Sequence, residues 1–283
     1  MTPVGWQARE GAAVTATDTL EHARQAVLAV DTAEGPTLAA APAWFDGSAM
    51  WCLTSAQSEI VAALTAHRAC RVSVGGAGDG VVADGHARCY GPDLPVATAL
   101  HGLPILAVLG MIGARRTASL SATLRNPARM AGAWPPAAPA VLRVRITDPY
   151  PVAAPTVEPA LAPGLPAAVP ADVRRAVAGL RRVIVAVRAQ PGRLEVAPTT
   201  WEGSSDVDLA AATWDVTVTD APRPAAVLLT AAQGEQEPSR GLVLSGDLRG
   251  TRLSPQRVRW WRGSETGSAT LSASGSDALQ LPD

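Results

Sequence analysis

The feature that most constrains the fold is a stretch from Thr37 to Val74 in which short extended and helical patterns alternate. Two apolar runs, residues 37–45 and 49–53, flank the dipeptide Asp46-Gly47. Asp-Gly between apolar runs predicts a tight β-hairpin whose two turn residues both adopt positive φ. The stretch is therefore expected to begin with two antiparallel strands.

A short helix is predicted directly after this hairpin. Thr54 and Ser55 offer side-chain oxygens that can accept hydrogen bonds from the first free amides of a helix. Ile60 and Leu64 then recur with the spacing of one helix face, and residues 71–74 return to an extended pattern. The predicted order is strand, tight turn, strand, capped helix and strand.

This order resembles the core of the pyridoxamine 5′-phosphate oxidase-like family, the flavin-binding split barrels. The matching segments read WFDGSAMWCLTS, SEIVAALTAHRACRVSV and VVADGHARCYG. The resemblance implies a mainly β fold with flanking helices (α+β). It also implies FMN as cofactor, with its phosphate at Thr54, Ser55 and Ser58, because family members place a Thr/Ser pair beside that phosphate.

One position departs from the family pattern. The helix after the second strand usually carries a basic residue that also reaches the phosphate, and that position is Ile60 here, preceded by Glu59. A buried phosphate needs donors or cations. Arg71 and Arg88, on neighbouring predicted strands, are candidate replacements. An arginine from the second half of the chain is the other possibility, and the candidates are Arg240, Arg249, Arg257 and Arg259.

The 283 residues are enough for two ordinary domains. Residues 148–171 are rich in proline and alanine and read as a semi-rigid linker. We assign residues 1–147 to a first split barrel with a helical insertion at about 93–130, and residues 172–283 to a second. The second half repeats the order of elements of the first. Two split barrels in tandem would imitate the dimer of single-domain members, with the flavin between the halves.

Other side chains have both a functional and a purely structural interpretation. Trp51 could stack on a flat cofactor ring, although tryptophan is more often part of a core. His86 is a conceivable axial haem ligand, but an isolated histidine is more often structural. Thr54 and Ser58 could equally serve only as helix caps, and the arginines could be solvated ends of strands.

Composition narrows the possible partners. The net charge of −1 gives no reason to expect nucleic acid, and the absence of lysine excludes Schiff-base chemistry. Three cysteines without a C-x-x-C pair, and no recognisable signal peptide, suggest the cytoplasm. The apolar run at 103–113 is too short to span a bilayer, so no membrane partner is expected. The histidines form no metal motif.

Two functions remain open. The first is an FMN-dependent oxidoreductase acting on an unknown small molecule; its catalytic side chains cannot be named because the flavin carries the chemistry. The second is a split barrel that has lost FMN and binds haem, a deazaflavin or a small metabolite, as a binding module or a repurposed enzyme. Ile60 is the residue that keeps the second function open. The protein is expected to be a monomeric pseudo-dimer or a homodimer.

Overall fold

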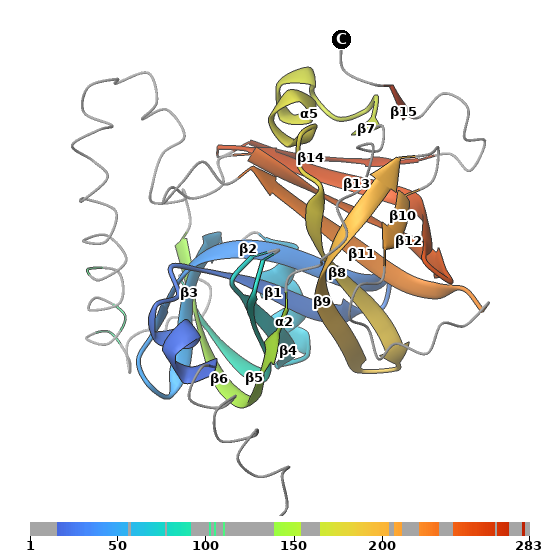
Figure 1. Cartoon of the computed structure of the whole chain (residues 1–283). Helices are drawn as coiled ribbons and strands as arrows, with labels where there is room; N and C mark the ends of the chain where they lie inside the picture. The colour runs from blue at the N-terminus through green and yellow to red at the C-terminus, as the bar shows by residue number, and fades with distance from the viewer. Residues whose placement is uncertain are drawn as a thin grey trace, which may run out of the picture.

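The structure is a computed structural model of the whole chain (Figure 1). The structure describes residues 16–55, 58–76, 78–91, 139–153, 165–203, 207–210, 221–231, 240–263, 265–271 and 279–280, together with Gly102, Ile105 and Gly110.

The first half forms a closed barrel with the strand order β1-β2-β3-β6-β5-β4, and β4 pairs back onto β1. All neighbouring strands are antiparallel. Helix α2 (Glu59–Ala66) joins β3 to β4, and a short helix at 16–21 precedes β1. The strands are β1 (Gln25–Thr32), β2 (Gly35–Phe45), β3 (Ala49–Ser55), β4 (Ala69–Val74), β5 (Gly80–Tyr90) and β6 (Pro139–Val152).

The predicted hairpin is present between β2 and β3, but its turn differs from the prediction. Gly47 has a φ of 91°, whereas Asp46 is not among the residues with positive φ. The reason is that the Asp46 carboxylate accepts hydrogen bonds from the amides of Ser48 and Ala49, at 2.8 and 2.7 Å, and so closes a three-residue loop itself. An aspartate that caps its own turn in this way does not need positive φ.

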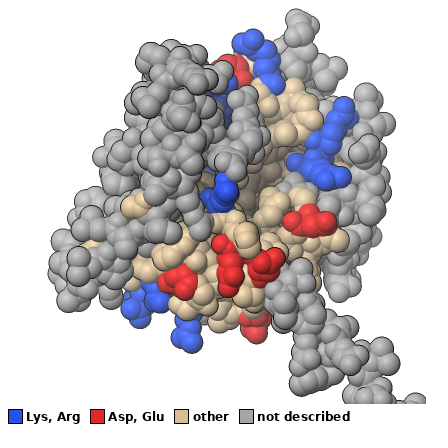
Figure 2. All heavy atoms as spheres, turned by 60° about the vertical axis from the view of Figure 1, so that its left-hand side comes forward, with Lys and Arg blue, Asp and Glu red and all other residues tan. Residues whose placement is uncertain are grey.

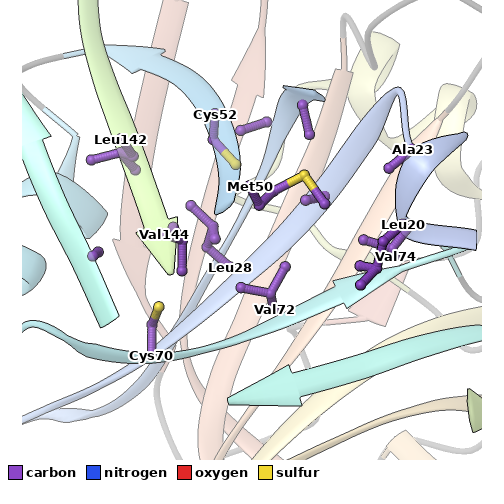
Figure 3. Packing of buried hydrophobic residues seen from close by; sticks show 14 of the residues in the cluster. Leu20, Ala23, Leu28, Met50, Cys52, Cys70, Val72, Val74, Leu142 and Val144 are labelled. Carbon is purple, nitrogen blue, oxygen red and sulfur yellow. The ribbon is translucent and has the colours of Figure 1, made fainter. Parts of the chain in front are cut away.

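The interior of the first barrel is apolar and closely packed (Figure 3). Inward residues alternate with outward ones along each strand, as the pleat requires. Helix α2 contributes Ile60 and Leu64 to this core, which explains the four-residue spacing in the sequence. Labelled members that point toward one another in Figure 3 include Leu28, Met50, Cys52, Val72, Leu142 and Val144.

The second half forms a seven-stranded sheet that also closes on itself, because β10 pairs with β13. Around this ring the order is β8-β9-β10-β13-β12-β11, which is the order of the first barrel, and β14 is added beside β13. The elements are α5 (Ala171–Val177), β8 (Arg182–Gln190), β9 (Arg193–Gly203), β10 (Val207–Ala210), β11 (Arg223–Ala231), β12 (Arg240–Arg249), β13 (Arg252–Arg262) and β14 (Glu265–Thr270).

Two tryptophans of β13 lie flat against glycines of the neighbouring strands. A Cβ added at Gly241 would come within 2.2 Å of the Trp261 ring, and one added at Gly267 within 2.1 Å of the Trp260 ring. Both glycines pair directly with the tryptophan in question. Gly241 and Gly267 therefore have a packing role in this sheet, because a side chain at either position would collide with a tryptophan ring.

The predicted fold class is confirmed: the described residues are mainly β, with few helices, a closed six-stranded barrel and a second sheet of matching strand order. The domain boundaries stay a prediction. Strand β6 runs past 147 to Val152, and β7 (Leu165–Pro166), which pairs with β15 (Leu279–Gln280), falls inside the predicted linker. Most of the insertion at 93–130 lies outside the described residues.

The two barrels pack against each other through an apolar cluster of their own (Figure 1). The first barrel contributes outward side chains of β1, β2 and β5, and the second contributes those of β8, β9, β11 and β12. The buried members are Val27, Ala29, Leu38, Val82, Ile184, Ala186, Leu194, Val196, Ala226, Leu228 and Val243. No helix in the described part of the chain is long and apolar enough to cross a membrane.

Candidate functional site

The two barrels have the same strand order, so the pairing of their strands shows which residues hold equivalent positions. In the first barrel one row across the strands runs through Val27, Ser73, Val82 and Tyr150. In the second barrel the corresponding row runs through Ile184, Leu228, Val243 and Arg259. Tyr150 of β6 and Arg259 of β13 therefore occupy equivalent positions, at matching ends of the two rows.

A second pair of equivalent residues lies on β2 and β9. Val30 pairs with Thr37, and Val187, which holds the place of Val30 in the second barrel, pairs with Glu195. Thr37 on β2 thus corresponds to Glu195 on β9. The boundary between the barrels therefore contains two related junctions, and their polar residues differ.

The first, which we call the α2 junction, comprises Glu34, Thr37, Glu59, Arg257 and Arg259. Here β13 of the second barrel reaches the start of α2 in the first. An Nη atom of Arg259 lies 2.6 Å from a carboxylate oxygen of Glu59, and the other Nη donates a hydrogen bond to the Thr37 hydroxyl. Arg257 pairs with the exposed Glu34 at 2.5 Å.

Arg259 is the least solvated cation of this junction. Its side chain is only 20% exposed, and its Nε is buried without a hydrogen-bond partner among the described residues. Burial lowers the pKa of its guanidinium, the Glu59 carboxylate raises it, and nearby Arg257 lowers it, with a net decrease. An orphaned buried donor on a cation is a group that an anionic oxygen would satisfy.

Ile60, where the family resemblance places a basic residue, points inward as its spacing with Leu64 predicts. Ile60 is 2% exposed and its side chain belongs to the barrel core, so a basic residue there would point into apolar packing. The first-turn residue that faces the junction is Glu59. The charge that distinguishes this helix start is therefore the carboxylate of Glu59, with Arg259 of the second barrel as its counter-ion.

The predicted phosphate-binding hydroxyls lie together at the start of α2. Ser58 is the N-cap residue, and its amide donates to the Ser55 carbonyl at 3.0 Å. The Thr54 hydroxyl donates to the Ser58 hydroxyl at 3.3 Å. Ser58 makes no side-chain capping bond to the helix, so the purely structural alternative, a helix cap, is not what its hydroxyl does here.

Trp51 lies elsewhere, on the outer face of β3. Its indole Nε1 donates to the Asp46 carboxylate at 2.7 Å, its ring stacks on Tyr90 at 6.3 Å, and Arg143 lies over the ring at 5.5 Å. Ile105 covers this face. The contacts give Trp51 a packing role there and leave its predicted stacking on a cofactor untested.

The first-barrel arginines proposed as replacements are not beside the helix start. Arg71 is on β4, and β3 and β4 are separated in the ring by two strands on either side. Its guanidinium is held instead by Asp84 at 2.7 Å and by the Tyr150 hydroxyl at 3.0 Å. Arg88 and His86 point outward from β5 and are exposed.

We call the second cluster the Tyr150 junction; it comprises Arg71, Asp84, Tyr150 and Glu195. Burial raises the pKa of Tyr150, Arg71 lowers it, and the carboxylates of Asp84 and Glu195 raise it, with a net increase. One oxygen of Glu195 is buried and accepts no hydrogen bond from the described residues. The cluster was not foreseen from the sequence, since its members lie far apart in the chain.

Two of the three cysteines are sequestered from solvent. Cys52 and Cys70 are free and buried, and burial raises the pKa of both thiols, that of Cys70 to about 12. Such thiols are poor nucleophiles.

No group of three or more His, Cys, Asp and Glu among the described residues could hold a metal ion. Figure 2 shows one face on which arginines and acidic residues lie around a hollow.

Searches against family models and against curated proteins found no match. Similar solved structures include an FAD-binding protein of Mesorhizobium loti (18% identity, 49% of this chain and 92% of that chain, TM-score 0.37). Others are General Stress Protein 26 of Bacillus anthracis (12%, 49% and 91%, 0.32) and a putative pyridoxamine 5′-phosphate oxidase of Listeria innocua (11%, 47% and 92%, 0.29). These names agree with the resemblance noted in the sequence. Because each match spans about half of this chain at a TM-score below 0.5, the fold assignment rests on the strand order of the two barrels.

Proposed function

We propose that this protein binds a flavin-type cofactor at the α2 junction, with FMN as the first candidate, and acts as an oxidoreductase on a small molecule. The observation that carries the proposal is the position of Arg259. A cation from the second barrel, with an orphaned Nε, lies at the start of the helix where the family resemblance puts the phosphate.

The residues of this junction have the chemistry that a phosphate needs. The Ser58 and Thr54 hydroxyls and the free first-turn amides of α2 are donors, and a helix N-terminus favours an anion. Arg259 and Arg257 supply positive charge from the second barrel. When bound, the flavin would supply the redox chemistry, while the chain orients it and excludes water.

Glu59 favours a second candidate function. Its carboxylate already neutralises Arg259 and would repel a phosphate at the same helix start. A chain with this residue suits a ligand that brings no phosphate to α2, such as haem or a small metabolite. Under the first function FMN binds and Glu59 weakens its binding. Under the second function FMN does not bind at all.

The test is titration of FMN by fluorescence quenching with the wild type, Arg259→Gln and Glu59→Gln. Removing a charge-assisted contact of about 1.4 kcal/mol or more lowers affinity at least tenfold, so we expect that loss for Arg259→Gln. Glu59→Gln should bind FMN more tightly than the wild type, because it removes a negative charge beside the phosphate. An absorbance spectrum of the purified protein shows whether a flavin or a haem is already bound.

Arg249→Gln is the matched control. Arg249 is an exposed residue at the end of β12 and makes no contact in the α2 junction, so its loss should leave FMN affinity unchanged. Equal binding by Arg259→Gln and Arg249→Gln would place the phosphate elsewhere. No FMN binding by any of the variants would favour the second candidate function.

A further inference from the structure

The tandem arrangement raises the question of how many cofactors one chain holds. A symmetric dimer has two identical junctions, and both would have to bind or neither. Here the two junctions have the same place in the fold and different residues. We infer that one chain binds a single flavin-type cofactor, at the α2 junction, and that Tyr150 and Glu195 are the residues that exclude it from the other. This inference rests on the proposed function.

The first observation is that equivalent positions in the two junctions carry different polar groups. Where the α2 junction has the Thr37 hydroxyl, the Tyr150 junction has the Glu195 carboxylate. Where the α2 junction has the Arg259 guanidinium, the Tyr150 junction has a phenol. In place of the hydroxyl donor, the Tyr150 junction has a carboxylate, which repels an anion. In place of the cation, it has a neutral phenol, which adds no charge to attract one.

The second step concerns the charges that remain. At the Tyr150 junction one guanidinium, Arg71, faces two carboxylates, Asp84 and Glu195. At the α2 junction two guanidiniums, Arg257 and Arg259, face the two carboxylates of Glu34 and Glu59. Burial, with the two carboxylates adding to its effect, raises the pKa of Tyr150, so the phenol adds no charge to this junction. Counted over the described residues, a phosphate would therefore meet excess negative charge at one junction only.

The third step is that Arg71 is already engaged. Asp84 holds its Nε at 2.7 Å, and the Tyr150 hydroxyl accepts from its Nη1 at 3.0 Å. The guanidinium also lies 6.0 Å from the Tyr150 ring centroid, within range of a cation–π contact. By contrast, Arg259 retains a buried donor without a partner among the described residues.

The stoichiometry of FMN binding tests the inference. Calorimetric titration of the full chain should give one FMN per chain. Tyr150→Phe should leave both the stoichiometry and the affinity unchanged, because Tyr150 belongs to the junction that does not bind. Arg259→Gln should weaken the single site at least tenfold. The double variant Tyr150→Arg/Glu195→Thr copies the pattern of the α2 junction and should acquire a second, weaker site.

Two equivalent sites in the wild type would overturn the inference and leave the proposed function intact. A single site that Tyr150→Phe weakens and Arg259→Gln does not would also overturn it, by placing the cofactor at the other junction. A folded double variant that gains no second site would contradict the roles given to Tyr150 and Glu195. No FMN binding by the wild type would overturn the proposed function and this inference with it. Thermal melting of each variant distinguishes lost binding from lost folding.

Discussion

Asp46 shows how much one side chain can organise. Its carboxylate oxygens accept hydrogen bonds from the amide and hydroxyl of Ser48, the amide of Ala49 and the indole of Trp51, so one residue closes the first hairpin and fixes a buried tryptophan. Burial by itself would raise the pKa of this carboxyl, but these four hydrogen bonds outweigh it and lower the pKa below 3.8. The ionised form is thus favoured in the folded state.

We therefore expect the contribution of Asp46 to stability to depend on pH. It is fully present above the ordinary pKa of 3.8 and is lost as pH falls through the lower folded value. Asp46→Ala leaves the Trp51 indole without an acceptor, which costs about 1–3 kcal/mol at pH 7. Urea unfolding of the wild type and the variant at pH 7 and at pH 3 checks this. A difference in stability that is equally large at both pH values would contradict it; Asp46→Asn, which keeps one acceptor, serves as the control.

At the scale of elements, one part of the outer face of β3, β5 and β6 is apolar and covered. Trp51, Leu53, Tyr90 and Val141 form a buried cluster there, and Ile105, a helical residue from the predicted insertion, packs into it at 7% exposure. The sequence predicts that the apolar segment at 103–112 covers the barrel. Ile105 is the described residue that does so.

Ile105→Asp should accordingly destabilise the protein by on the order of 3 kcal/mol, because it buries an unpaired charge. Exposure of Trp51 should also shift the tryptophan emission to longer wavelength. Ile105→Val is the matched control and should cost only about 1 kcal/mol. Thermal or urea unfolding followed by tryptophan fluorescence measures both. If the two variants were equally stable, the segment would not be part of the cover.

At the scale of the whole molecule, one ion pair shows why the two barrels are not interchangeable. Asp31 and Arg188 hold equivalent positions, two residues beyond the equivalent Ala29 and Ala186. They pair with each other at 2.5 Å, and both side chains are largely buried. In a symmetric dimer two copies of one residue would meet here. Opposite charges can meet here because the two halves of the chain have different residues at this position.

This arrangement predicts strong coupling between the two positions. Asp31→Arg should lower the free energy of unfolding by about 2 kcal/mol or more, because two guanidiniums would then face each other in a partly buried place. The charge swap Asp31→Arg/Arg188→Asp should recover about half of that loss. Full recovery is not expected, because the Gly192 amide and the Thr32 carbonyl also bind the native pair. Additive losses in a double-mutant cycle would show that the pair does not hold the barrels together.

Sequence alone determined the parts of this protein that depend on local pattern. Asp46-Gly47 between apolar runs placed the hairpin, the spacing of Ile60 and Leu64 placed α2, and the repeated order of elements predicted two barrels. Each of these features depends on residues that are close in the sequence, because hydrogen bonding in a turn or a helix links positions a few residues apart. Even so, the conformation of Asp46 was predicted wrongly, since its own side chain replaced the backbone geometry expected for the dipeptide.

The contacts between the barrels depend on tertiary packing, and no local pattern predicts which residues make them. Arg259 was one of four second-half candidates, and nothing local separated it from Arg240 or Arg249; its partner Thr37 lies 222 positions away. Ile60 points inward, as its spacing with Leu64 predicts, but helical spacing shows which residues share a face and not what that face packs against. Contacts of this kind follow from how two closed barrels dock. That docking is set by the shape of an apolar surface assembled from seven strands, and such a surface has no local signature in the chain.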